Sequence, residues 1–243
     1  RLMAISRIGN NGIDLGNVGN TDDGILHINA SSGAKNIVIE ADRDSEGQGL
    51  GNLQFHSAGT NVVQVSGARG SSDAKGDLVF YTDGGSLTER MRIDEDGHIT
   101  KPTQPAFLAL PASNVTNFSK DGNNTIAFGT EVFDQNGDFA TPNFTAPVTG
   151  RYQLNLMVYL YQIQNDAQYY FTQIVTSNRT YMNIIDPEGW AEANYHSFII
   201  SILADMDASD TAYGNVYQAG GTNTQTDIIS DSNGTYFSGY LVA

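Results

Sequence analysis

The chain of 243 residues contains no cysteine, only one tryptophan and no long apolar run. The absence of cysteine excludes disulfide bridges, cysteine nucleophiles and thiolate metal sites. No segment approaches the roughly 20 apolar residues that a membrane-spanning helix needs, so membrane insertion is not expected. The four histidines are dispersed, and neither a Ser-His-Asp spacing nor an HExxH motif occurs. We therefore assign no catalytic residue and do not expect an enzyme.

Cations are scarce, and the formal net charge is −15 at pH 7. Residues 106–243 contain 3 Lys and Arg against 13 Asp and Glu, whereas residues 1–105 contain 9 and 14. So acidic a chain is a poor partner for a phosphate backbone, and we expect no nucleic acid. Carboxylates that lie close in sequence, such as Asp205, Asp207 and Asp210, are expected by chance here. A polysaccharide depolymerase that uses such a pair is the least favoured function.

Residues 1–100 contain short stretches of apolar residues separated by Gly, Asn, Asp and Ser, without a helical period. Each stretch has the ordinary length of a β-strand. Their apolar content is too thin for a core within one chain, so we expect an elongated β-structure that neighbouring chains cover. The predicted strands are Ile25–Asn29, Asn36–Ala41, Asn52–Ser57, Asn61–Ser66, Asp77–Thr82 and Glu89–Ile93.

Two prolines, Pro102 and Pro105, stand in the short segment 101–105. Proline favours an extended and stiff connection. We therefore predict a linker at 101–105, between a β-rich shaft module at 1–100 and a head domain at 106–243.

The strand Arg151–Tyr161 is the strongest pattern in the head. Every second residue from Tyr152 to Leu160 is apolar or aromatic, which predicts a strand with one face in a core. The opposite face is polar at first and turns apolar at Met157, Tyr159 and Tyr161. A strand buried on both faces needs a second cover, either another layer or another subunit. We predict a subunit interface at these three residues, which the resemblances given below make a trimer interface.

Further alternating segments extend over the rest of the head, and about eight antiparallel strands predict a β-sandwich or jelly roll. Residues 177–196 are expected to be a long connection. The other predicted strands are Ala106–Leu110, Thr125–Phe133, Gln168–Thr176, Phe198–Met206, Thr211–Gln218 and Thr235–Val242.

The segment Val62–Thr100 contains a recognisable series of positions: Gly76, Leu78, Phe80 and Thr82, the string ERMRID at Glu89–Asp94, and then Gly97 and Ile99. With this series the segment resembles a module common in phage tail fibres and related virion proteins. That resemblance implies a trimeric fibre shaft. This chain departs from the family after Thr100, where many members continue with a self-cleaving chaperone domain.

A second series of positions runs in order through the head: Ala106-Phe107, Ile126 and Phe128, the segment from Phe144 to Tyr152 with Ala146-Pro147-Val148 and Gly150, Ala208–Thr211, and Tyr236–Leu241. With this series the head resembles the globular jelly roll of the C1q and tumour-necrosis-factor family. The resemblance implies a compact trimer in which the first and last strands run side by side and aromatic residues pack near the threefold axis. This chain departs from the family at Ser209 and in the 177–196 connection.

Ligand candidates gather in the segment Asn178–Ser197, which contains the only tryptophan. Aromatic rings stack on the C–H faces of sugars while amides and carboxylates bond their hydroxyls, so the composition suits a glycan. The alternative is that the tryptophan closes the end of the sandwich. The candidates are Arg179, Tyr181, Asp186, Glu188, Trp190 and Tyr195.

A metal site is a weak possibility at Asp134, Asn136 and Asp138, whose alternating oxygens resemble part of a calcium loop. The closing glutamate of such a loop is missing, and Asn-Gly is an ordinary turn sequence. We favour a turn and expect no cofactor, with a structural ion as the alternative.

The pattern as a whole predicts an all-β chain, with a trimeric β-rich shaft followed by a C1q-like antiparallel jelly-roll head. The expected function is the distal part of a viral (phage) tail fibre that attaches the virion to a host-cell surface receptor, a glycan or a protein. The expected partners are two further copies of the chain and that receptor, and the expected location is the virion. Alternatives are a purely structural trimerisation head, or a bacterial adhesin that is secreted or held at the cell surface.

Overall fold

The computed structural model describes residues 39, 41–190, 193–230 and 234–243. These residues form antiparallel strands joined by turns, and no helix that could span a membrane occurs among them. Residues 43–243 form one compact unit. The predicted strand Ile25–Asn29 lies outside the described residues, as does most of the predicted strand Asn36–Ala41.

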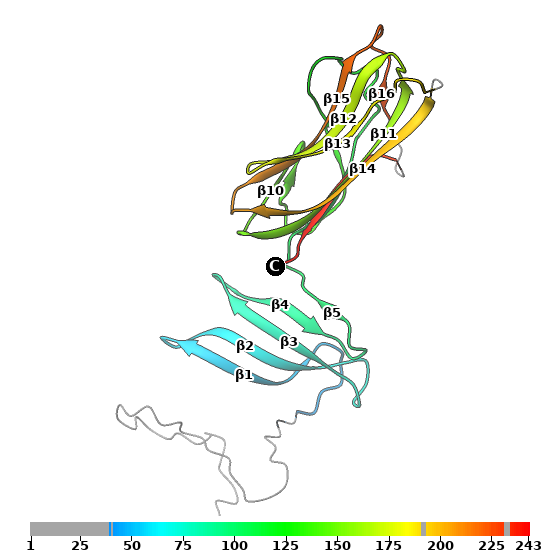
Figure 1. The fold of residues 1–243 in the computed structure, drawn as a ribbon. Coiled ribbons are helices and arrows are strands. Elements are labelled where there is room, and N and C mark those ends of the chain that lie inside the picture. The colour runs from blue at the N-terminus through cyan, green and yellow to red at the C-terminus, as the bar shows by residue number, and fades with distance from the viewer. Residues whose placement is uncertain (1–38, 40, 191–192, 231–233) are drawn as a thin grey trace, which may run out of the picture. The chain divides into compact units, whose positions relative to one another are not determined.

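The first sheet, sheet A, is a five-stranded meander in the order β1-β2-β3-β4-β5, drawn in blue to green in Figure 1. The four strands predicted between residues 52 and 93 are confirmed, each a few residues longer than expected. Gly97, one of the positions that carry the resemblance of Val62–Thr100, lies in a turn with φ of 88°. The strands are β1 (Gly49–Ser57), β2 (Thr60–Arg69), β3 (Gly76–Asp83), β4 (Leu87–Ile93) and β5 (Ile99–Thr100).

Sheet A has one apolar face. Cross-strand pairing aligns Leu53 with Val65, Val65 with Phe80, and Phe80 with Met91, and directly paired residues share a face. Leu53 is 59% exposed, and the other side chains of this face are exposed or half-buried. No second layer covers it within the described part of the chain. By this register the face consists of Leu53, Phe55, Val63, Val65, Leu78, Phe80, Met91, Ile93 and Ile99.

The head contains two further antiparallel sheets packed face to face, which confirms the predicted β-sandwich. Sheet B has the order β14-β11-β17-β6-β8, with β16 beside β11. Sheet C has the order β13-β12-β15-β10-β9, with β7 beside β15. The strands are β6 (Ala106–Leu110), β7 (Asn124–Thr125), β8 (Thr130–Asp134), β9 (Phe139–Ala140), β10 (Asn143–Thr145), β11 (Gly150–Ile163), β12 (Ala167–Thr176), β13 (Thr180–Ile185), β14 (Ala193–Met206), β15 (Thr211–Gly220), β16 (Asp227–Ile228) and β17 (Tyr236–Leu241).

The first and last strands of the head lie side by side, because β6 pairs with β17 from Ala106↔Tyr240 to Ala109↔Phe237. This matches the expectation drawn from the jelly-roll resemblance. Consecutive strands repeatedly cross from one sheet to the other, as the order of strands in both sheets requires.

Strand β11 is an interior strand of sheet B, between β14 and β17, and in Figure 1 it runs alongside β14 over much of the length of the head. Its alternate residues from Tyr152 to Leu160 are buried at 0–1% exposure, as the period of two predicts. The hydroxyl of Tyr152 donates to the carbonyl oxygen of Val148 over 2.7 Å, and burial raises the pKa of this hydroxyl. A Cβ on Gly150 would lie 2.7 Å from the carbonyl oxygen of Ala243. The motif Ala146–Tyr152 therefore fixes how the chain enters the core.

The predicted strand Thr125–Phe133 is wrong as a single element. Residues 126–129 are in no strand, and they separate β7 in sheet C from β8 in sheet B. Ile126 and Phe128 are fully buried, whereas Val132 and Phe133 are half exposed. The alternation in this segment reflects a chain that crosses between the sheets, so its apolar residues do not share one face.

The predicted connection over residues 177–196 is also wrong. Half of it is strand: Thr180–Ile185 is β13, which pairs with β12, and β14 begins at Ala193. The remaining link between β13 and β14 is Asp186–Glu192, of which residues 186–190 are described. Asparagine and methionine within Thr180–Ile185 hid its alternation, although Tyr181 and Ile185 do pack against the core.

Candidate functional surfaces

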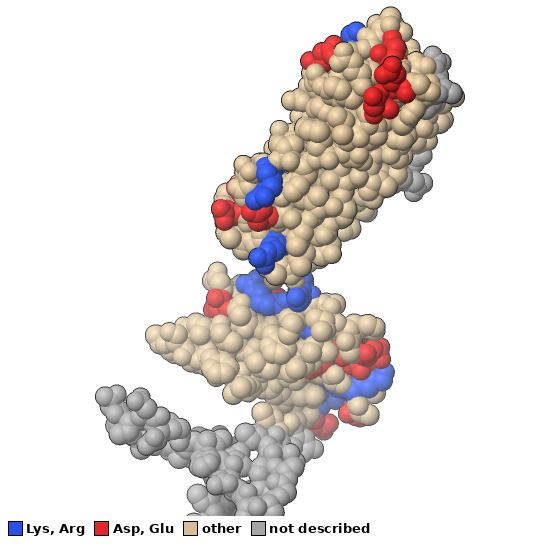
Figure 2. Space-filling view, in the orientation of Figure 1, with Lys and Arg blue, Asp and Glu red and all other residues tan. Residues whose placement is uncertain are grey.

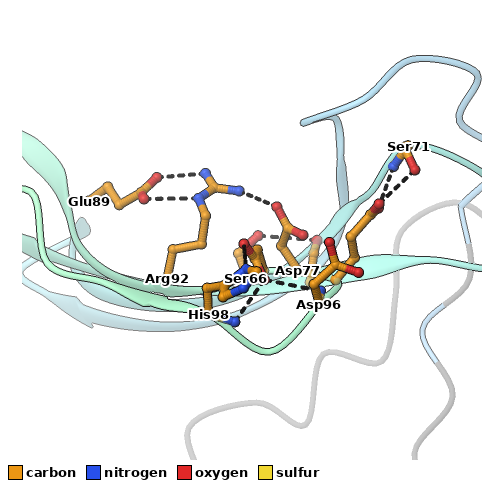
Figure 3. Close-up of polar contacts among 10 residues, drawn as sticks. Ser66, Ser71, Asp77, Glu89, Arg92, Asp96 and His98 are labelled. Atoms are coloured by element: carbon orange, nitrogen blue, oxygen red, sulfur yellow. Dashed lines mark hydrogen bonds and ion pairs between the residues drawn. The ribbon is translucent and has the colours of Figure 1, made fainter.

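The ERMRID string, Glu89–Asp94, forms most of strand β4 and the start of the turn after it. Arg92 Nη2 and Nε each contact the Glu89 carboxylate, at 2.7 and 3.0 Å, while Nη1 contacts Asp77 Oδ2 at 2.5 Å (Figure 3). The bonds to Glu89 and Asp77 raise the pKa of Arg92. Arg92 therefore joins β4 to β3 on the polar face of sheet A, while Glu89 of the same strand holds its guanidinium in place.

The last residue of the string caps the following turn. Asp94 Oδ1 accepts from the backbone N–H groups of His98 and Asp96 at 2.8 and 3.0 Å, and the bond from His98 leads the causes that lower the Asp94 pKa. Next to it, Glu95 accepts from Lys75 Nζ at 2.8 Å and from the Ser71 amide and hydroxyl. The bond from Lys75 and those from Ser71 lower the pKa of Glu95 to about 2. These contacts stabilise the turns that border sheet A.

The outer face of sheet B carries the three residues predicted for a trimer interface. Met157, Tyr159 and Tyr161 point away from the core, since their neighbours Leu156, Val158 and Leu160 are buried. The same face is apolar over most of its width. Its other apolar members are Leu108, Leu110, Phe133, Tyr195, Ile199, Leu203, Tyr236 and Tyr240.

At the edge of this face, Leu108, Leu110, Val132 and Tyr236 line an apolar hollow of about 430 Å³. The centre of the sheet B face, in contrast to the hollow, is polar but uncharged. Gln153 Nε2 donates to Ser201 Oγ at 3.0 Å, and Ser201 donates to Asn155 Oδ1 at 2.8 Å. These amides and hydroxyls bond one another, so most hydrogen-bonding groups in the middle of the face have partners within one chain.

The six ligand candidates do not line one site. Arg179 lies in the β12–β13 turn, where its Nη2 is 3.0 Å from Asp205 Oδ2, and both side chains are mostly exposed. Trp190 follows the far end of β13, which at ~3.3 Å a residue lies ~20 Å away. Tyr181 points inward and packs against the core.

Tyr195 belongs to the outer face of sheet B, where its ring lies 5.3 Å from that of Tyr159 and 4.8 Å from that of Tyr161. One ligand candidate thus joins two of the predicted interface residues in an aromatic cluster. This cluster depends on the pairing of Tyr161 with Tyr195 across β11 and β14. The pairing of two strands cannot be recognised in a single sequence.

Asp186, Glu188 and Trp190 form a tight turn. Asp186 Oδ1 accepts from the Glu188 N–H at 2.9 Å, and the Trp190 N–H donates to the Pro187 carbonyl oxygen at 3.0 Å. The indole ring is 5.1 Å from the ring of His196, whose pKa is lowered by burial. The indole is therefore partly packed at the end of the sandwich, in agreement with the alternative that the tryptophan closes this end.

The candidate metal loop is a capped turn. Asp134 Oδ1 and Oδ2 accept from the N–H groups of Asp138 and Phe139 at 3.1 and 2.9 Å. Asn136 Nδ2 donates to the Thr103 carbonyl oxygen at 2.9 Å, away from the loop centre. Burial raises the pKa of Asp138, and the nearby negative charge of Asp134 raises it further. Within the described residues, no three acidic or histidine side chains gather as ion ligands.

The predicted linker is bonded to the head. Gln104 Nε2 donates to the Leu241 carbonyl oxygen at 2.7 Å, and Gln135 Nε2 donates to the carbonyls of Lys101 and Gln104 at 2.9 and 2.7 Å. The glutamine of the Asp134–Asp138 turn thus holds the linker backbone. Prediction from sequence missed this role, since a loop amide gives no sign of its partner.

Comparison with known proteins gives similarity of fold only. No protein-family model and no curated protein matches the sequence. Among solved structures, the globular domain of the zebrafish complement 1qA protein is 14% identical, with a TM-score of 0.42, over 58% of this chain and 98% of its own. Murine APRIL, at pH 5.0 and pH 8.5, is 11% identical with TM-scores of 0.42 and 0.43, over 58% of this chain and all of its own.

Proposed function

We propose that the chain is a homotrimeric, non-enzymatic attachment protein of a viral tail fibre, in which a β-rich shaft carries a jelly-roll head that binds a host-cell surface. The observation that carries this proposal is the apolar face of sheet A. A single antiparallel layer with one whole face apolar is not independently stable in water, because that face must be buried against another layer. A second copy of the same chain offers a matching apolar face.

The head supports the same proposal. The outer face of sheet B is apolar over much of its width, and patches of this kind usually mark an interface. The number three comes from the two family resemblances, both of which imply trimers. In a trimer each weak receptor site is present three times, which raises the avidity of attachment.

A pair of substitutions on adjacent residues tests the shaft contact. Leu53 lies on the apolar face of sheet A, and Gln54 lies on the opposite face, where its Nε2 donates to Gln64 Oε1 at 2.8 Å. Leu53→Asp should dissociate the assembly to single chains in light-scattering chromatography, because three carboxylates cannot be buried together. Gln54→Asp is the matched control and should leave the trimer intact. Equal behaviour of the two variants would contradict the proposal.

A purely structural head is the second candidate, and the bonds that hold the linker to Leu241 and Gln135 of the head favour it. A chain that ends before residue 106 distinguishes an attachment head from a purely structural head. Loss of adsorption to host cells with a trimeric shaft supports attachment, whereas loss of the trimer itself supports a clamp. Asp186, Glu188 and Trp190 remain our candidates for receptor contacts at the loop end of the head. Trp190→Ala, measured by adsorption, tests them.

A further inference from the structure

The outer face of sheet C carries a row of aromatic rings. Residues of β12 and β15 that point away from the core pair directly across the sheet, with Phe171 opposite Tyr217 and Gln173 opposite Asn215. The Phe171 and Tyr217 rings lie 4.7 Å apart and are parallel to within 6°. Tyr169 extends the row, 6.1 Å from Phe171 and 6.2 Å from Tyr217. The three rings are half-buried, so part of each remains open to solvent.

This face is free of charge in a chain with a net charge of −15. Strands β12, β13 and β15 contain no Asp, Glu, Lys, Arg or His. On the side of the head seen in Figure 2, charged residues gather at the two ends and the stretch between them is neutral. A neutral surface neither attracts nor repels an ionic ligand, and it leaves aromatic and amide contacts to decide what binds.

An amide cluster borders the rings. Asn215 Nδ2 donates to Gln173 Oε1 at 3.0 Å and to Asn123 Oδ1 at 3.2 Å. Asn215 is 2% exposed, yet its Oδ1 has no donor among the described residues. A buried acceptor without a donor carries a free-energy cost that a hydroxyl donor relieves. The amides of the sheet B face, in contrast, bond one another.

We propose that the outer face of sheet C, centred on Tyr217, Phe171 and Gln173, is a binding platform for a neutral glycan. Aromatic rings accept the C–H faces of neutral sugars, while the half-buried Gln173 amide, which Asn215 holds in place, exchanges hydrogen bonds with their hydroxyls. The inference rests on the proposed function in one respect: sheet B faces the other copies, so the opposite side of the sandwich stays open. Three platforms per trimer then act together on a cell surface.

The test measures binding of the whole chain to a fixed panel of neutral hexasaccharides of glucose, mannose, galactose and N-acetylglucosamine, with hexagalacturonate as an acidic probe. At least one neutral probe should bind, and the acidic probe should not. Tyr217→Leu, which keeps an apolar side chain but removes the ring, should weaken that binding about tenfold. Tyr217→Phe should retain most of it. The matched control is Tyr81→Leu, a tyrosine on the polar face of sheet A, and it should bind as the unmodified chain does.

Light scattering on the same samples separates this inference from the proposed function. The platform alone is overturned by trimers that bind none of the neutral probes, or by equal affinity of the unmodified chain and the Tyr217→Leu variant. Loss of binding in Trp190→Ala with full binding in Tyr217→Leu would place the site at the Asp186–Trp190 turn and also overturn it. Dissociation of the trimer by Tyr217→Leu would make this face a subunit contact and would overturn the platform too. A monomeric unmodified chain contradicts the proposed function, whichever probe binds.

Discussion

Sheet A and the head are both built from antiparallel β-strands, but only the strands of the head enclose a hydrophobic core. In the head, two sheets enclose a core with residues such as Tyr152, Phe237 and Ile174 at 0% exposure. In sheet A, Ala68 and Val79 are the buried hydrophobic residues of the described strands, and both lie on the polar face. The head therefore has its own core, whereas sheet A depends on surfaces beyond its single layer. The predictions below test that difference, from the largest effect to the smallest.

Phe107→Ala should give the largest loss of stability. The Phe107 ring stacks on Phe139 and Phe144 at 5.0 and 4.7 Å and meets Phe237 edge-on at 5.1 Å. Truncation leaves a cavity among these rings and should lower the free energy of unfolding of the head by ~3–5 kcal/mol. Denaturant unfolding followed by the tryptophan signal measures it. A loss below about 1 kcal/mol would mean that the head is not stabilised by this core.

Phe55→Ala tests sheet A in the same way. Phe55 is 51% exposed in one chain, so an isolated chain should lose little. In the proposed trimer the side chain is buried, and the loss should exceed about 2 kcal/mol. The unmodified chain should also unfold at a higher temperature when its concentration is raised, because association stabilises it. A small loss with no dependence on concentration would place Phe55 in solvent.

A pair of glycine substitutions compares packing in the two regions. A Cβ on Gly239 would lie 2.7 Å from Leu154 Cδ2 and 2.8 Å from Phe107 Cε1, so Gly239→Ala should cost ~1–3 kcal/mol through overpacking. In sheet A the nearest atom to a Cβ on Gly67 is Leu50 Cβ at 3.9 Å. Gly67→Ala should therefore leave the thermal midpoint almost unchanged. Equal shifts of the two midpoints would contradict the difference in packing.

The smallest effect concerns pH. The pKa of Glu95 is lowered to about 2 in the folded chain, so the unfolded chain takes up this proton first as the pH falls. The stabilisation is complete above the ordinary pKa of about 4.5 and is lost as the pH falls toward 2. Glu95→Gln should flatten the dependence of the thermal midpoint on pH in that window. Ser71→Ala, which removes the hydroxyl donor, should give an intermediate slope, and an unchanged slope in both variants would exclude this role.

The sequence predicts strands well where one face meets a complete core. The alternation from Tyr152 to Leu160 is strict because every second side chain is buried, and it locates β11 correctly. The alternation of Ile126, Phe128 and Val132 has the same period but belongs to a chain that changes sheets. Apolar residues at every second position indicate which side chains are buried, but they do not indicate which sheet the segment belongs to.

The candidate sites were harder to predict, because they depend on which strands are neighbours. Tyr195 was grouped with Trp190 on sequence distance, yet its ring packs on Tyr159 and Tyr161 across a strand pair. The platform of sheet C was missed for the same reason. Tyr169 and Phe171 lie far from Tyr217 in the sequence, and only the register of β12 with β15 brings them together.

The mass of the unmodified chain in solution tests the central claim most directly. Multi-angle light scattering at micromolar concentration should give three times the mass of one chain. Dilution or Leu53→Asp should lower that mass toward one chain, while Gln54→Asp should not. A single-chain mass for the unmodified protein would mean that the apolar face of sheet A is not buried against other copies, and would contradict the account.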